Sequence, residues 1–108
     1  MTAWLGEFEQ LVLFAVLHLD PHAYGVTIRR AIEDRAGRPV SAGAVYTTLE
    51  RLERRGLLSS AWGEPTAERG GKRKRYYRLR PAGRAALGRS WDAIRAMARG
   101  AAHKLEQS

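Results

Sequence analysis

The chain has 108 residues, an apolar content of 44% and a formal net charge of +8 at pH 7, which suits one packed domain with a basic surface. It has no cysteine, which excludes disulfides and thiolate metal sites, and no apolar run approaches the roughly 20 residues that span a bilayer. The pI of about 10.8 is typical of nucleic-acid binders, although an anionic membrane surface or an acidic protein partner would also suit it.

The first predicted helix runs from Leu5 to Leu19, where apolar residues recur at 3.6 spacing in a stripe so wide that other elements must cover most of it. Asp20-Pro21 ends it, because the residue before a proline is pushed out of helical geometry. Glu7 and Glu9 stand where a secretory signal would carry basic residues, so we expect no such signal.

A second helix is predicted from about Ala23 to Ala36, and it ends in a turn that contains Gly37 and Pro39. Its expected inner face consists of Tyr24, Ile28, Ala31 and Ile32, and its expected solvent face of Arg29, Arg30, Glu33 and Asp34.

A third helix is predicted between Ser41, a good N-cap, and Gly56, where a left-handed residue is favoured after the last turn. Val45, Leu49 and Leu52 form the buried face. The first turn carries only small residues, which a helix needs if it enters a DNA groove by its N-terminal end. Taken alone, the stretch would equally suit a core helix; together with the tight turn before it, it predicts a helix-turn-helix.

A β-hairpin follows, with strands at Leu57–Trp62 and Arg75–Leu79 and a polar loop between them. Seven basic residues and no acidic one occur between Arg69 and Arg80, and like charges this close favour an anionic partner. The predicted fold class is therefore mainly α with a small β-hairpin, a winged helix-turn-helix over residues 1–80.

Residues 81–108 are predicted to form one further helix, which starts at Pro81 and serves dimerisation. Apolar residues step by four and three along it, as on a coiled-coil seam: Leu87, Trp91, Ile94, Ala98, Ala101 and Leu105. A tryptophan on such a seam is expected to be buried against a second subunit rather than left in water. The alternative is that the helix folds back on its own domain.

Residues for other chemistry are sparse. His18 and His22 have metal-ligand spacing, but Asp20-Pro21 separates them and no fitting third ligand is evident. Glu50 and Glu53 lie among arginines and suggest pairs on the helix surface. We find no catalytic constellation and expect neither an enzyme nor a cofactor.

Three stretches of the chain share a pattern. The helix and strand at residues 44–58 read AVYTTLERLERRGLL, the wing at 70–79 reads GGKRKRYYRL, and the last helix starts GRAAL at 83–87. Tyr24-Gly25, at the head of the second helix, fits the same pattern. Together these motifs resemble the PadR-like family of transcriptional regulators. Many relatives have a proline where this chain has Thr47, which bears on the bases read, and a threonine where it has Arg80.

The resemblance implies a cytoplasmic, nucleoid-associated homodimeric repressor with two winged domains and C-terminal helices that pair. In relatives, a small hydrophobic or aromatic effector can bind near the dimer interface and release DNA. Here Trp4, Phe8 and Trp91 are the candidates to line such a site; each would equally suit a core aromatic.

The candidate DNA contacts come from the third helix and the wing. They are Ser41, Gly43, Ala44, Tyr46 and Thr47 near bases or adjacent phosphates, and Arg51, Lys72, Arg73, Lys74 and Arg75 on the backbone. A two-fold dimer predicts a pseudo-palindromic operator with half-sites about one turn, or a multiple of it, apart. The alternatives are a protein-interaction module that docks an acidic partner, and an RNA-binding wing.

Overall fold

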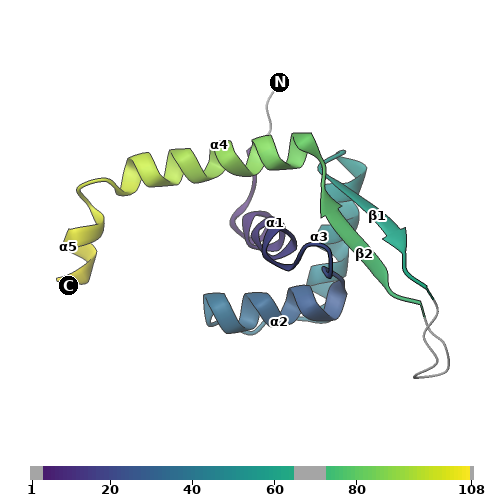
Figure 1. Cartoon of the computed structure of the whole chain (residues 1–108). Helices are drawn as coiled ribbons and strands as arrows, with labels where there is room; N and C mark the ends of the chain where they lie inside the picture. The colour runs from purple at the N-terminus through teal and green to yellow at the C-terminus, as the bar shows by residue number, and fades with distance from the viewer. Residues whose placement is uncertain (1–3, 65–72, 108) are drawn as a thin grey trace.

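Five helices and one two-stranded sheet make up the computed structural model, which describes residues 4–64 and 73–107 (Figure 1). In chain order they are α1 (Glu7–Leu19), α2 (Gly25–Ala36), α3 (Ala42–Arg54), β1 (Leu58–Trp62), β2 (Arg75–Leu79), α4 (Pro81–Ala98) and α5 (Ala102–Glu106). This order confirms the predicted fold class, a mainly helical chain with a small β-hairpin.

The core is built around α1, which contacts α2, α3, α4 and β2 (Figure 1). Val12, Leu13 and Val16 of α1 are completely buried, as are Val45, Leu49 and Leu52 of α3. Each such side chain contributes roughly 1.5–3 kcal/mol by leaving water. The apolar stripe on α1 is therefore covered on most sides, as its width predicts.

Both ends of α3 follow the prediction. The Ser41 hydroxyl accepts a hydrogen bond from the Ala44 amide at 3.1 Å and caps the helix. Gly56, just beyond the C-terminal end, adopts a φ of 77°, which a side chain with a Cβ would resist. These two residues fix where α3 begins and ends.

The two strands pair antiparallel, with Leu58 opposite Leu79 and Trp62 opposite Arg75. Tyr77 of β2 is buried against the helices, whereas Arg78 points to the other face of the sheet. The Tyr77 amide donates to the carbonyl of Ala23 at 2.8 Å, so the segment before α2 is joined to the wing.

Tyr24 does not lie on the inner face of α2, and that prediction is wrong. It precedes the helix as the N-cap, where its amide donates to the Thr27 hydroxyl at 3.0 Å. The Tyr24 ring instead meets Tyr76 of β2 edge to face, with ring centroids 5.6 Å apart. Its role is to pack the start of α2 against the wing.

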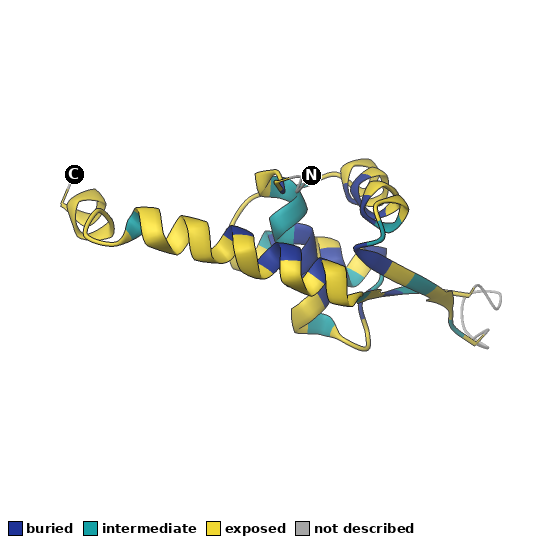
Figure 2. Ribbon diagram, turned by 90° about the horizontal axis from the view of Figure 1, so that it is seen from above, coloured by how far each residue is buried: buried dark blue, intermediate teal, exposed yellow. Residues whose placement is uncertain are grey.

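The prediction that one helix carries the apolar seam to Leu105 is also wrong. The helix α4 starts at Pro81 as predicted but ends at Ala98, and Gly100 with a φ of 81° separates it from α5. Figure 2 shows α4 projecting from the domain, buried near its start and exposed beyond. No helix in the described residues is long and apolar enough to cross a membrane.

Candidate nucleic-acid interface

One face of α3 points straight away from the core. Because Val45, Leu49 and Leu52 mark the inner side, the 3.6-residue repeat places the opposite side at Gly43, Thr47, Glu50 and Arg54, and all four are exposed. We call these four residues the outward stripe. Its first half is small or neutral, so the backbone of this helix can approach a surface closely.

The predicted contacts Ser41, Ala44 and Tyr46 flank this stripe. Ser41 and Ala44 are exposed at the first turn. The Tyr46 ring leans toward α2 so closely that a Cβ on Gly25 would overlap it. Tyr46 still keeps 49% of its surface exposed, and it therefore both joins the two helices of the helix-turn-helix and presents an edge to solvent.

Beyond Tyr46, α3 faces the wing. Burial raises the pKa of the Tyr77 phenol, and the nearby carboxylates of Glu53 and Glu50 add to the rise while Arg75 opposes it. The Tyr77 hydroxyl is therefore neutral at physiological pH. The ion pair between Glu53 and Arg75, at 3.2 Å, joins α3 to β2 of the wing.

Arg51, a predicted phosphate contact, is paired inside the molecule. Its Nε lies 3.0 Å from a Glu9 carboxylate oxygen, and Arg55 donates to the same oxygen at 3.1 Å. Burial raises the pKa of Glu9, but hydrogen bonds from the Gly6 amide and Arg51, with the charge of Arg55, outweigh it and hold the pKa below its usual value. A phosphate would have to compete with Glu9 for Arg51.

The wing cations divide into two groups. Arg75 lies 3.2 Å from a Glu53 oxygen and donates to the Ser60 hydroxyl at 2.8 Å, so its charge is partly neutralised. Arg73 donates to the carbonyl of Gly63 at 3.0 Å and Lys74 lies over the Tyr24 ring. Neither of these two meets a carboxylate within 4.0 Å in the described residues, and Lys72 lies outside them.

Several charged residues near this face were not nominated from the sequence. Arg29 and Arg30 line a groove of about 210 Å³ between α2 and Tyr46; the signal for them was that the first helix of a helix-turn-helix crosses the DNA backbone. Glu50 and Arg54 lie on the outward stripe. The sequence suggested that Glu53 pairs with an arginine on the surface of its own helix, and that prediction is wrong, since Glu53 pairs with Arg75 of β2. Glu50 makes no ion pair among the described residues.

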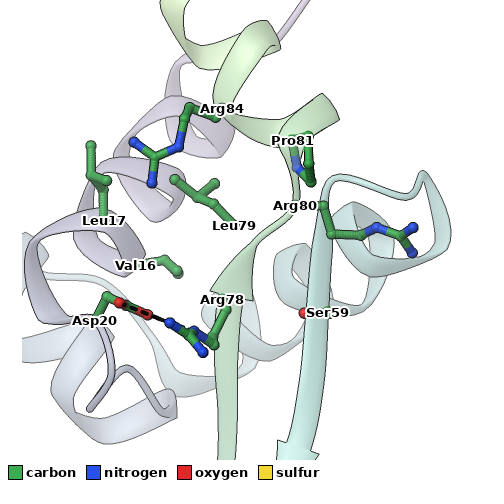
Figure 3. A pocket seen from close by; sticks show the side chains of 9 residues that line it. All are labelled: Val16, Leu17, Asp20, Ser59, Arg78, Leu79, Arg80, Pro81 and Arg84. Carbon is green, nitrogen blue, oxygen red and sulfur yellow. Dashed lines mark hydrogen bonds and ion pairs between the residues drawn. The ribbon is translucent and has the colours of Figure 1, made fainter.

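A second hollow lies at the base of the wing, where β2, α1 and α4 meet (Figure 3). It has a volume of about 430 Å³, and three arginines are among its lining residues, Arg78, Arg80 and Arg84. Figure 3 shows Arg78 pointing to Asp20, with their closest N–O distance at 2.9 Å. This pair ties the wing to the end of α1, directly beside the start of α4.

The candidate effector residues do not form one cluster within the chain. Trp91 packs edge-on against Phe14 with ring centroids 6.1 Å apart, Phe8 lies beneath Arg38, and Trp4 is exposed. Among the dimerisation candidates, Leu87 is buried in its own domain, whereas Trp91, Ile94 and Leu105 are exposed. No group of three metal-ligating side chains gathers within residues 4–64 and 73–107.

Comparison with known proteins identifies the family. The model of the transcriptional regulator PadR-like family matches residues 13–89, well over half of the chain. The transcriptional regulator Rv3488 of Mycobacterium tuberculosis is 38% identical over 98 residues, covering 88% of this chain and 87% of the relative.

Solved structures show the same architecture. A PadR family regulator from Eggerthella lenta is 29% identical, with a TM-score of 0.68 over 94% of this chain and 88% of that one. Bacillus subtilis PadR, solved in complex with operator DNA, shares the fold at 17% identity and a TM-score of 0.62, over 75% of this chain and 45% of that one. The chain belongs to the PadR-like family of transcriptional regulators and is not an enzyme.

Proposed function

We propose that the protein is a homodimeric repressor that binds a specific duplex DNA sequence. The observation that carries the proposal is the outward stripe of α3 beside a wing whose Arg73 and Lys74 meet no carboxylate in the described part of the chain. A surface of this kind offers a helix to the major groove and cations to the phosphates. The operator complex of Bacillus subtilis PadR supports it by analogy.

In this proposal the N-terminal half of α3 lies in the major groove. Ser41, Gly43, Ala44, Tyr46 and Thr47 approach bases or adjacent phosphates, and the free amides of the first turn add a favourable site for phosphate. Lys72, Arg73 and Lys74 bind the backbone beside the groove. Arg51 and Arg75 also bind the DNA backbone in this proposal, after a phosphate replaces Glu9 as the partner of Arg51 and Glu53 as the partner of Arg75.

We assign DNA binding to residues 1–80 and dimerisation to 81–108. The face of α4 that buries Leu87 continues past the domain as Trp91, Ile94, Met97 and Ala98. Met97 is 81% exposed and Ile94 49%, and such an apolar surface favours a second copy. Leu105 on α5 is a further exposed apolar residue for that interface. The resulting two-fold axis calls for a pseudo-palindromic operator.

For release from DNA we propose a small aromatic effector at the Trp91–Phe14 pair, with Trp4 and Phe8 as further candidates to line its site. Such a protein acts on the nucleoid in the cytoplasm. Planar aromatic compounds should quench tryptophan fluorescence and lower operator affinity. A broad panel that leaves both unchanged would remove the effector from the proposal.

The deciding experiment is selection of bound sequences from a random duplex pool at about physiological salt, where non-specific phosphate binding is suppressed. We expect an enriched inverted repeat, bound at least a thousandfold more tightly than random duplex. Replacement of Arg73 and Lys74 by Ala should weaken all duplexes and flatten the slope of log K against log salt by about 0.9 for each lost phosphate contact. Arg84→Ala with Arg89→Ala removes the same charge on α4 and is the matched control.

Folded, dimeric protein that enriches no sequence would contradict the proposal. Weak and sequence-blind DNA binding would then point to docking of an acidic protein partner, and preference for single-stranded or structured RNA would point to an RNA-binding wing.

A further inference from the structure

Glu50 differs from the other glutamates around α3 because it has no ion pair or hydrogen bond among the described residues. Glu9 is held by Arg51 and Arg55, Glu53 by Arg75, and Glu33 by Arg29. Glu50 is exposed on the outward stripe. An unpaired carboxylate there is unexpected in a protein of net charge +8 that approaches phosphates.

In the docking proposed above, Glu50 would lie over the major groove rather than at its edge. It follows Gly43 by seven residues, which is two turns and about 10 Å along the helix axis, on the same face. The flanking positions toward the phosphates are occupied by other residues, Arg51 on the α1 side and Glu53 with Arg75 on the wing side. Since Gly43 and Thr47 are small, α3 can enter deeply enough for Glu50 to reach base edges.

The chemistry of a carboxylate selects among those edges. It offers only hydrogen-bond acceptors, so it needs a donor, and the major groove presents donors at cytosine N4 and adenine N6. Adenine places the N7 acceptor beside its donor, which repels a carboxylate, whereas cytosine does not. We propose that Glu50 is a specificity-determining residue that accepts a hydrogen bond from the N4 amino group of a cytosine in each operator half-site.

The inference rests on the proposed function, and the same sequence selection tests it with three variants. We expect the parent protein to enrich cytosine at one half-site position, with about a tenfold preference. Glu50→Ala should remove the cytosine preference at that position and leave the other positions unchanged. Glu50→Gln should shift the preference toward adenine, whose N6 and N7 atoms glutamine can bind together. Asp34→Asn, the control, removes one exposed carboxylate from α2 and should keep the parent preference.

A double-mutant cycle isolates the contact. Cytosine-to-thymine change at that position replaces the N4 donor by the O4 acceptor, and it should weaken the parent about tenfold but Glu50→Ala by less than twofold. If both Glu50 variants enrich the parent sequence and bind every duplex more tightly by the same factor, Glu50 acts only by repelling the phosphates. The inference is then wrong, while the proposed function stands. If the parent protein enriches no sequence, both fall. Unchanged thermal melting shows that the variants fold, as expected for an exposed side chain that makes no hydrogen bond or ion pair with the described residues.

Discussion

The Glu9 carboxylate should be a pH-dependent brace between α1 and the C-terminal half of α3. Its side chain is only 12% exposed, and one oxygen accepts from Arg51 and Arg55 at 3.0 and 3.1 Å while the other accepts from the Gly6 amide at 2.8 Å. A hydrogen bond to a charged group contributes about 1.5–3 kcal/mol. The arginines are partly exposed, so we expect Glu9→Gln to lower the free energy of unfolding by about 2 kcal/mol at pH 7.

The sign with pH follows from the lowered pKa of Glu9. A carboxyl whose pKa is lower in the folded state stabilises the fold above its unfolded pKa of 4.5, and that contribution is lost as the pH falls through the folded value. The gap between parent and Glu9→Gln should therefore narrow as the pH falls below 4.5 and through the lowered pKa of Glu9.

Urea unfolding at pH 7 and at pH 3, at one protein concentration, measures this gap. The control is Glu7→Gln, which breaks a pair with Arg38 in which Glu7 is 76% exposed and should cost at most about 0.5 kcal/mol. A Glu9→Gln loss below about 0.5 kcal/mol at pH 7, or an equal loss at both pH values, would refute the reasoning, because the second result indicates lost packing rather than lost charge.

Three further changes probe other parts of the structure. Ser41→Ala removes the hydroxyl that accepts from Ala44 and should cost about 1 kcal/mol in urea unfolding; an unchanged midpoint would mean that this cap does not stabilise α3. Gly25→Ala places a methyl group in the Tyr46 ring, so we expect a lower melting temperature and weaker operator binding, and Gly25→Ala with Tyr46→Ala should restore part of the stability. Trp91→Ala removes a half-exposed ring from the proposed dimer interface and should shift sedimentation toward monomer; a dimer of parental affinity would place the interface elsewhere.

Local patterns were sufficient to predict most of the elements. The 3.6-residue spacing of Val45, Leu49 and Leu52 identified α3, and the chemistry of Ser41 and Gly56 identified its ends. These features act within a few residues, so they can be recognised without knowing the fold. The family motifs then supported the winged arrangement.

Long-range pairing could not be predicted in the same way. Glu9 lies 42 residues from Arg51, and Asp20 lies 58 from Arg78, and no spacing rule connects positions so far apart. The seam on α4 shows the same limit, because Leu87 and Trp91 fit one pattern whether they pack on their own domain or on a partner. Leu87 is buried and Ile94 is exposed because the domain ends between them along α4, and the sequence pattern does not mark that point.

These pairings change what the net charge of +8 means for the proposed DNA interface. Glu9, Glu53 and Asp20 hold Arg51, Arg75 and Arg78, so much of the positive charge on α3 and β2 first fixes the wing and α1 relative to α3. Phosphate binding then falls to cations such as Arg73 and Lys74 and to the amides at the start of α3. Affinity and base selection would thus be carried by different residues, since the outward stripe carries no positive charge before Arg54.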